Sequence, residues 1–280
     1  MLESLAGVTI VTPDLDRTIA AYGDWLGYRA GPVATVGTGR ATFWGAPAAA
    51  DARMIHLHPE KGEPRFIRLI EGRPDPAYRP LAHHGWAAAE IIVQDVERLA
   101  ERLGLPDSPF RVIGPPAVLD FDFTDRIKAM QVVGPAGEVL YLTEVSGEIP
   151  GFDLPRAESF VGPLFIMVLG AAEIAGSAGT YAGLGRAAGP ILKARIEVLS
   201  AAHALPADHR HQLTTVALNR QSYLEIDALP PGATPRPLSS IGLPAGLSMV
   251  SFHAGSAAAR MVIGAAGEWL EISPQSDHPF

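Results

Sequence analysis

The sequence predicts an α+β protein built from four repeated strand–helix units, each followed by further strands. Residues 7–31, "GVTIVTPDLDRTIAAYGDWLGYRAG", contain a β-branched run, a Pro-Asp pair typical of a helix start, an amphipathic helix and a Leu-Gly helix end. The same order begins again at Gly85 and at Pro163, and both copies also end in Leu-Gly. Recurrence of one strand–helix pattern along a chain indicates repeated structural modules.

Strand-like runs follow each of these units, so the predicted module is βαβββ. A fourth unit begins with "LSMVSFHAG" at residues 247–255 and leads at once into two short strands, so we expect it to have lost most of its helix. The runs that follow the first three units are residues 53–58 and 65–71, 129–134 and 138–145, and 213–218 and 222–229.

Two modules close on the same local frame. The second reads "GPAGEVLYL" from Gly134 and the fourth reads "GAAGEWLEI" from Gly264. The frame places Tyr141 in one strand where the other strand carries Glu271. A phenol and a carboxylate at matched positions predict that the two modules differ in chemistry.

Chain length and a proline- and glycine-rich segment together predict two domains. A chain of 280 residues exceeds the size of most single hydrophobic cores. The segment "GEIPGFDLPRAES" separates the second module from the third. We therefore expect an N-terminal domain of two modules at 1–147, a linker at 148–159, and a C-terminal domain of two modules, the last truncated, at 160–280.

Composition excludes several classes of function. The net charge is −8 without a cluster of Lys and Arg, which argues against nucleic acid as a partner. The absence of cysteine excludes disulfides and thiolate sites. No apolar run approaches the roughly 20 residues of a membrane-spanning helix, and the N-terminus lacks a signal-peptide pattern. We expect a cytoplasmic protein with a small-molecule substrate and no membrane or nucleic-acid partner; a homodimer is left open.

The module order resembles that of the vicinal oxygen chelate superfamily, which includes glyoxalases, bleomycin-resistance proteins and extradiol dioxygenases. The residues that carry the resemblance are "VTIVTPDLDRTIAAYGDWLG" and the closings "GPAGEVLYL" and "GAAGEWLEI". The resemblance implies that modules pair into two open, barrel-like mixed sheets, each around a cavity. It also implies that any metal ligands, typically His and Glu, lie on the first and last strands of each module.

The ligand positions implied by the resemblance carry few residues that could bind a metal. Glycine cannot ligate through a side chain, and arginine is a permanent cation. We therefore predict no metal in the N-terminal domain. The first-strand positions are Gly7, Ala88, Ile166 and Met249, and the last-strand positions are Arg68, Tyr141, Glu225 and Glu271.

The C-terminal domain leaves two alternatives. Glu225 and Glu271 keep carboxylates, and His253 shares a strand face with Met249, so these three could hold Mg, Mn or Fe(II). Alternatively, the carboxylates pair with arginine or backbone groups and the histidine is structural. An extradiol dioxygenase site needs two histidines and one carboxylate, so that activity is disfavoured.

The N-terminal domain also leaves two alternatives. Strand alternation places Glu90 on the same face as the other inward positions, with His56 on a neighbouring strand. Arg68 would then clamp a carboxylate or enolate, Tyr141 would donate a hydrogen bond, and His56 or Glu90 would move a proton. The alternative is an internal Arg68–Glu90 pair with Tyr141 covering the core.

Two functions follow from these residues. The first is an enzyme of lyase or isomerase type that acts on a small oxygenated aromatic or carbonyl metabolite, with a degenerate or absent metal site. The second is a non-catalytic small-molecule binder like the bleomycin-resistance proteins. The segment "DFDFTD" at 120–125 either coats a cavity mouth with Phe121 and Phe123 or forms an ordinary half-buried edge.

Overall fold

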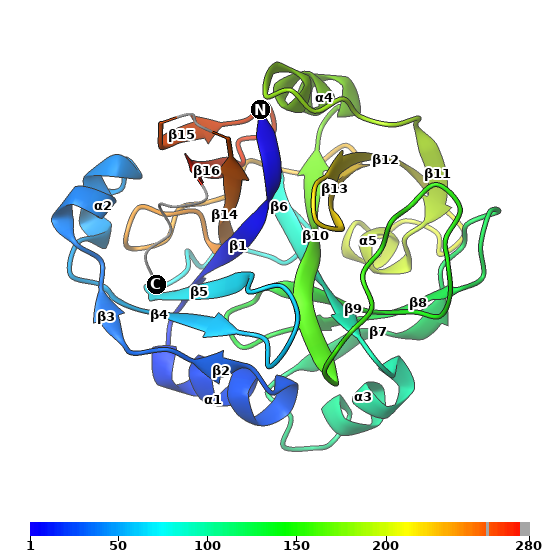
Figure 1. Cartoon of the computed structure of the whole chain (residues 1–280), viewed down its shortest axis with the longest axis horizontal. Helices are drawn as coiled ribbons and strands as arrows, with labels where there is room; N and C mark the ends of the chain where they lie inside the picture. The colour runs from blue at the N-terminus through cyan, green and yellow to red at the C-terminus, as the bar shows by residue number, and fades with distance from the viewer. Residues whose placement is uncertain (256–257, 275–280) are drawn as a thin grey trace.

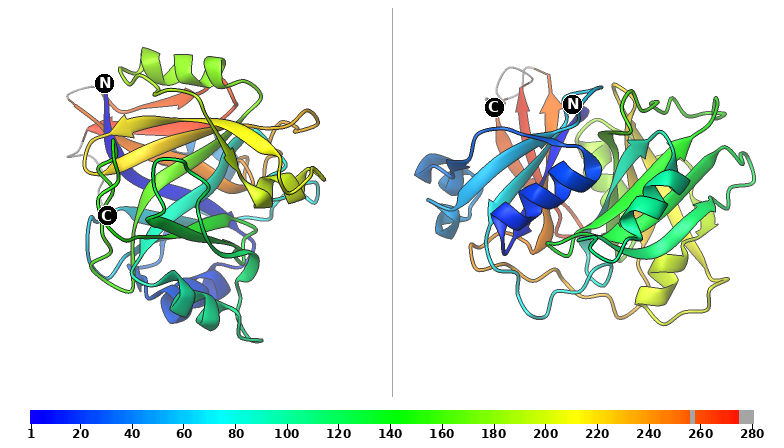
Figure 2. Two further views of the ribbon diagram at one scale, coloured as in Figure 1. Left: turned by 90° about the vertical axis from the view of Figure 1, so that its right-hand side faces the viewer. Right: turned by 90° about the horizontal axis from the view of Figure 1, so that it is seen from below.

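Two eight-stranded sheets form the protein, as a computed structural model covering residues 1–255 and 258–274 shows. Figure 1 shows them side by side, with the first sheet around β1 and β14 and the second around β6 and β10. Helices α1 and α3 lie at one end of the molecule and α4 at the other, and Figure 2 shows the same arrangement from two further directions. No helix in these two ranges is both long and apolar enough to cross a membrane.

The four expected modules are present, and the long strands lie where the sequence predicts them. The first consists of β1 (Leu2–Thr12), α1 (Leu15–Leu26), β2 (Arg29–Ala30), β3 (Ala34–Thr35), α2 (Thr38–Phe43), a 3-10 turn (Pro47–Ala49), β4 (Arg53–His58) and β5 (Phe66–Glu71). The second consists of β6 (Gly85–Val93), α3 (Val96–Leu103), β7 (Arg111–Val118), β8 (Ile127–Val133) and β9 (Val139–Val145).

The remaining two modules complete the pattern. The described residues hold no helix between β14 and β15, so the prediction of an abridged fourth module is confirmed for them. The third module consists of β10 (Val161–Ala171), α4 (Ile174–Gly183), β11 (Leu192–Arg195), α5 (Glu197–Ala202), β12 (Arg210–Leu218) and β13 (Ser222–Ala228). The fourth consists of β14 (Gly246–Ala254), β15 (Arg260–Ile263) and β16 (Trp269–Pro274).

Aspartates cap the N-termini of helices α1 and α3, at the positions predicted from the sequence. The Asp14 carboxylate accepts a hydrogen bond from the backbone N–H of Arg17 at 2.9 Å, and Asp95 does the same for Arg98. Each bond satisfies a backbone donor that the first helical turn leaves without an intrahelical partner. Helix α1 ends at Gly27, whose φ of 73° is a left-handed conformation that glycine adopts without strain.

The modules pair differently from the expectation. The first sheet has the strand order β15-β16-β14-β1-β5-β4-β2, so it joins modules one and four. The second has the order β11-β12-β13-β10-β6-β9-β8-β7 and joins modules three and two. Residues 1–147 and 160–280 thus contribute one module each to both sheets. The expected linker at 148–159 connects β9 to β10 within one sheet, instead of separating two domains.

The sequence pattern could not decide this pairing. The first strands of all four modules are buried along nearly their whole length, so each could meet any of the others edge to edge. In the structure β1 pairs antiparallel with β14, and β6 pairs antiparallel with β10. Hydrophobic alternation specifies which face of a strand is inward, but it does not specify the partner of the edge.

Two buried tyrosine–glutamate contacts join the sheets. The Tyr22 hydroxyl of α1 donates to the Glu138 carboxyl at 2.8 Å, and the Tyr181 hydroxyl of α4 donates to Glu268 at 3.2 Å. Each glutamate belongs to a closing frame of the opposite sheet. The second oxygen of Glu138 accepts from the backbone N–H of Ala136 at 2.8 Å. Burial raises the pKa of Glu138 to about 7.

We expect the Tyr22–Glu138 contact to stabilise the protein measurably. Tyr22→Phe should lower the free energy of unfolding by about 1–3 kcal/mol, because a buried carboxyl oxygen loses its donor. A urea-unfolding cycle of Tyr22→Phe, Glu138→Gln and the double variant should show coupling between the two sites. Tyr22→Phe combined with Glu268→Gln is the matched control and should be additive. Additivity in the first cycle would contradict the role of this contact.

Candidate functional site

In each sheet, residues from the first and last strands of both modules face one another. In the first sheet Thr9 lies opposite Arg68 and Ser251 lies opposite Glu271. In the second sheet the corresponding pairs are Glu90 with Tyr141 and Val168 with Glu225. The first-strand positions inferred from the sequence, which include Gly7, therefore each lie two residues before the residue that actually faces the last strand. They lie on the same face of the strand.

A close backbone contact explains the glycine at position 7. A Cβ atom at Gly7 would collide with the carbonyl oxygen and the ring of Phe66 on the neighbouring strand. Only glycine allows the Phe66 ring to lie over this strand. The absence of a side chain at Gly7 thus reflects packing.

The first sheet holds a buried ion pair at its facing positions. The Arg68 side chain is 2% exposed, and both of its Nη atoms donate to the Glu271 Oε2 at 3.0 Å. Arg68 also donates to the Thr9 hydroxyl at 3.2 Å. Glu271 accepts further hydrogen bonds from the Ser251 hydroxyl at 2.6 Å and the Trp44 indole N–H at 2.8 Å. The guanidinium group therefore fills the space between the facing positions.

This network makes Arg68 a structural cation. Burial alone would raise the pKa of Glu271, but the Arg68 guanidinium and the hydrogen bonds from Ser251 and Trp44 lower it to about 2. The rings of Trp44 and Phe66 lie 5.2 Å and 4.9 Å from the guanidinium carbon. The alternative of an internal Arg68–Glu90 pair is therefore wrong, because Arg68 pairs inside the protein with Glu271. Arg68 has no exposed edge with which to clamp a ligand.

The second sheet holds carboxyl groups without a cation. The Glu90 Oε1 accepts a hydrogen bond from the Thr143 hydroxyl at 2.6 Å. Burial, and then the neighbouring Glu225, raise the pKa of Glu90 to about 8. Burial raises the pKa of Glu225 to about 7, and burial together with Glu225 raises the pKa of Asp227. These three carboxyls form no ion pair with Lys or Arg anywhere in the described ranges.

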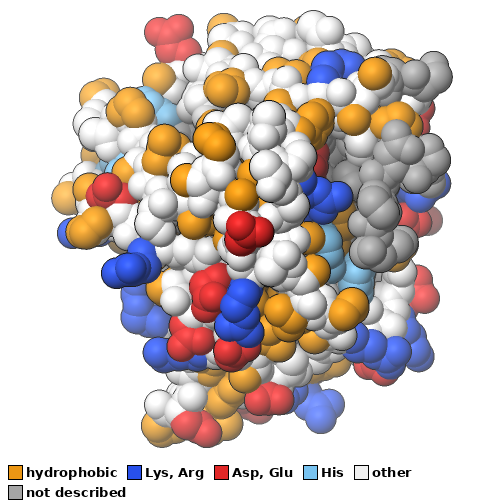
Figure 3. Space-filling model, turned by 90° about the vertical axis from the view of Figure 1, so that its left-hand side faces the viewer, with side chains coloured by type: hydrophobic (Ala, Val, Ile, Leu, Met, Phe, Trp, Pro, Cys, Tyr) orange, Lys and Arg blue, Asp and Glu red, His pale blue; other side chains and the backbone are white. Residues whose placement is uncertain are grey.

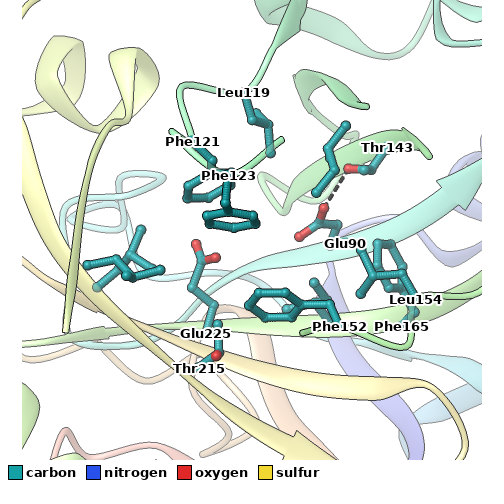
Figure 4. Close-up of a pocket in the computed structure, with 14 residues that line it drawn as sticks. Glu90, Leu119, Phe121, Phe123, Thr143, Phe152, Leu154, Phe165, Thr215 and Glu225 are labelled. Carbon is teal, nitrogen blue, oxygen red and sulfur yellow. Dashed lines mark hydrogen bonds between the residues drawn. The ribbon is translucent and has the colours of Figure 1, made fainter. Parts of the chain in front are cut away.

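An aromatic cavity opens onto two of these carboxyls. Figure 4 shows Glu90 and Glu225 pointing into it, with Phe123 and Phe152 on either side. The empty space, its open mouth included, is about 510 Å³. The ring of Phe123 stacks on Phe121 at 5.2 Å and on Phe152 at 5.7 Å between centroids. The segment at 120–125 therefore coats the cavity, and the supposed linker supplies Phe152.

Salt bridges hold the aromatic loop in place. The Asp120 carboxylate pairs with Arg195 of β11 and Arg210 of β12, each at 3.0 Å. Because Asp120 comes from the second module and both arginines from the third, the loop spans the two modules of the sheet. The mouth of the cavity is thus built from both halves of the chain.

The predicted site residues are divided between the two sheets. Arg68 and His56 lie in the first sheet, where the Arg68 Nε donates to the His56 Nε2 at 3.2 Å. Glu90 and Tyr141 are neighbours in the second sheet, on β6 and β9. Burial raises the pKa of the Tyr141 hydroxyl well above its usual value, and Asp227 adds to the effect. The predicted set of Arg68, Tyr141, Glu90 and His56 is therefore not one site.

The predicted metal ligands are not brought together either. Glu271 pairs with Arg68 in the first sheet, whereas Glu225 lies in the second. His253 lies farther along β14, beside Arg220 and Glu3. The pairing of modules one with four separates these residues. Within residues 1–255 and 258–274, no three His, Asp or Glu side chains are arranged to hold a metal ion. The facing positions of the first sheet include the cation Arg68, and those of the second sheet include Val168, which has no ligand atom. Neither group of residues therefore fits a resident metal.

The sequence did not identify Thr143 and Phe152 of the cavity lining, or the buried Asp227 next to Glu225. Asp227 and Thr143 each lie two residues beyond an identified position, Glu225 and Tyr141, so strand alternation contains the signal for both. Phe152 had no such signal, because it lies in a Pro/Gly-rich segment without periodicity. Its contribution depends on where the segment crosses the sheet.

Comparison with known proteins shows the fold. No protein-family model and no curated protein matches the sequence. Glyoxalase I from Zea mays has a TM-score of 0.63 at 13% identity, over 98% of this chain and 93% of that chain. A glyoxalase I mutant from the same plant has a TM-score of 0.64 at 14% identity, over 98% and 93%. A putative dioxygenase from Bacillus subtilis has a TM-score of 0.61 at 11% identity, over 99% and 86%.

The chain therefore has the fold of these glyoxalase I and putative dioxygenase structures, in agreement with the repeated-module pattern of the sequence. Identities of 11–14% establish the fold alone. The site must be interpreted from its own residues.

The buried ion pair generates a stability prediction. Glu271→Ala should destabilise the protein by about 3–5 kcal/mol, because it leaves the Arg68 guanidinium buried without a counter-charge. The double variant Arg68→Met/Glu271→Leu should recover most of this loss. Urea unfolding measures both effects. Glu60→Ala, which removes an exposed partner of Arg29, is the control and should change stability little. A double variant as unstable as Glu271→Ala would contradict this account.

The raised carboxyl pKa values generate a pH prediction. The folded state holds the Glu90 proton up to about pH 8, whereas the unfolded chain releases it near 4.5. The folded state therefore binds more protons in this window, and stability should fall as pH rises through it. Glu90→Gln should flatten the slope between pH 5 and 8 by up to about 1.4 kcal/mol per pH unit. Urea unfolding at several pH values tests this, with exposed Glu101→Gln expected to behave like the parent protein.

Proposed function

We propose that the protein is an enzyme that moves a proton on a small oxygenated molecule, aromatic or carbonyl-bearing, bound in the cavity of the second sheet. The observation that supports this most directly is the pair Glu90 and Glu225. Both carboxyls open into an apolar, aromatic cavity, both lack a cationic partner among the described residues, and both have pKa values raised toward neutrality. Such carboxyls are suited to acid–base catalysis near pH 7.

The two carboxyls can act as an acid and a base together. Near neutral pH the pair is partly ionised, so that one member carries a proton while the other is a carboxylate. The protonated member donates a hydrogen bond to the carbonyl oxygen of the substrate. The carboxylate removes a proton from the adjacent carbon: the C–H bond breaks, a carboxyl O–H bond forms, and the electron pair moves toward the oxygen as an enolate.

The fate of the enolate defines the reaction class. Return of the proton to a different carbon gives an isomerase, and loss of a leaving group from the neighbouring carbon gives a lyase. The Thr143 hydroxyl fixes the orientation of Glu90 through its hydrogen bond. Phe121, Phe123 and Phe152 hold planar apolar groups and limit access of water to the carboxyls.

A non-catalytic binder is the second candidate function. The walls of the cavity are mainly aromatic and aliphatic, and shape and apolar contact are sufficient to sequester a small molecule. In that case the carboxyls would only hydrogen-bond the ligand.

Deuterium exchange distinguishes the two functions. A panel of small aromatic and carbonyl compounds is incubated with the protein in D₂O, and loss of a C–H signal by NMR reports proton removal before any product is known. For a compound that exchanges, Glu90→Gln and Glu225→Gln should each slow exchange by about 10²-fold or more, with binding retained. Thr143→Val should have a smaller effect, and exposed Glu101→Gln should have none. Exchange should be insensitive to a chelator.

Two outcomes would contradict the enzymatic proposal. One is saturable binding in the cavity without exchange of any bound compound, which favours the binder. The other is exchange that both glutamine variants leave unchanged, which would place the proton-transfer group elsewhere.

A further inference from the structure

A second opening lies on the first sheet, away from the aromatic cavity. It is a groove bordered by β3, β4 and the start of α2, with about 890 Å³ of empty space including its open side. Arg40, His56 and His58 form its polar border, and Pro32 and Met54 lie among its apolar residues. Figure 3 views the side of the molecule that carries α2, where histidine side chains gather close to a Lys or Arg side chain.

The groove carries a positive charge for which residues 1–255 and 258–274 supply no ion-pair partner. The guanidinium groups of Arg40 and Arg68 lie 5.9 Å and 5.2 Å from the Trp44 ring centre, so both contact the same side chain. Glu271 neutralises Arg68. Arg40 forms no ion pair with any residue that the structure describes. Burial, and then the neighbouring Arg68, lower the pKa of Arg40. The group formed by the two arginines and Glu271 therefore has a net charge of about +1.

His56 adds a hydrogen-bond donor to this end of the groove. Arginine can only donate, so the bond from the Arg68 Nε at 3.2 Å requires a lone pair on the His56 Nε2. The ring proton is then on Nδ1. Burial, followed by Arg68 and Arg40, lowers the pKa of His56 to about 3, so the ring stays neutral at physiological pH. Arg40 and His56 thus both present N–H groups.

The remaining residues of the groove indicate what kind of ligand could accept hydrogen bonds from Arg40 and His56. Besides the polar border and Thr35, the groove is formed by glycine, alanine, proline and methionine residues, a surface that favours an apolar body over a small hydrated ion. We propose that the groove is a second binding site, which takes an organic anion with its carboxylate at Arg40 and His56 and its apolar part against Pro32 and Met54. This site uses none of the residues of the proposed proton-transfer site.

Titration with benzoate tests the proposal. The NMR signal of the Trp44 indole N–H reports on the site, because that ring contacts both arginines. Benzoate should shift the signal saturably, and benzyl alcohol, an uncharged compound of similar shape, should bind at least about tenfold more weakly. Inorganic phosphate should also bind more weakly than benzoate, because it lacks an apolar body.

Matched variants locate the binding. Arg40→Gln should weaken benzoate binding by about tenfold or more, and Arg40→Lys should fall between it and the parent protein. Arg111→Gln removes the same charge from an exposed position on β7 of the other sheet and should leave binding unchanged. Glu90→Gln should also leave this shift unchanged. The same variant should slow proton exchange by about 10²-fold or more, so failure of one proposal is distinguishable from failure of the other.

Three results would overturn the inference. Equal benzoate affinity in Arg40→Gln and Arg111→Gln would show that a general charge effect governs binding. Equal affinity for phosphate and benzoate would exclude a site for an organic body. The absence of any saturable shift with benzoate would show that the groove is not a binding site for this class of anion.

Discussion

The arrangement of the two sheets depends on a hydrogen bond that occurs twice, between a helix tyrosine of one sheet and a closing-turn glutamate of the other. Tyr22 reaches Glu138, and Tyr181 reaches Glu268. Each glutamate folds back over its own turn, and a side chain at Gly134 or Gly264 would collide with its carboxyl group. The repeated Gly-x-Ala-Gly-Glu sequence therefore buries a carboxyl group at a position where a tyrosine hydroxyl from the other sheet can donate a hydrogen bond to it. Tyr141 and Glu271 lie three residues beyond these glutamates. The same contacts therefore position the facing residues of the first and last strands in both sheets.

Equivalent positions in the two sheets have acquired opposite electrostatics. In the first sheet a guanidinium group lies among the facing residues, and Glu271 is held ionised with a pKa of about 2. In the second sheet no cation is present among the corresponding residues, and the pKa values of Glu90 and Glu225 rise to about 8 and 7. Burial is common to all three carboxyls, so the charge of the neighbour decides the direction. The first sheet thus holds a fixed ion pair, whereas the second sheet holds carboxyl groups that can gain or lose a proton near neutral pH.

The sequence predicted the elements and their inward faces because both depend on local periodicity. Strand alternation correctly placed Arg68, Glu90, Tyr141 and Glu271 in the interior. It could not predict which of them meet, since that depends on which module pairs with which. The sequence pattern therefore groups Glu271 with Glu225 and His253, whereas in the structure Glu271 lies against Arg68. The aromatic wall from Phe152 depends on the path of an irregular segment, for which no periodic signal exists.

The pairing of modules across the chain also limits where the protein can be cut and whether one half can be exchanged. The two halves of the sequence look like separable units, yet a cut in the segment between β9 and β10 would leave each piece with one module of either sheet. Each fragment would expose the long edge of a first strand that normally meets its partner, which is a template for aggregation. The two halves must therefore fold as interlocked partners, and neither can be exchanged for another unit without changing both sheets at once.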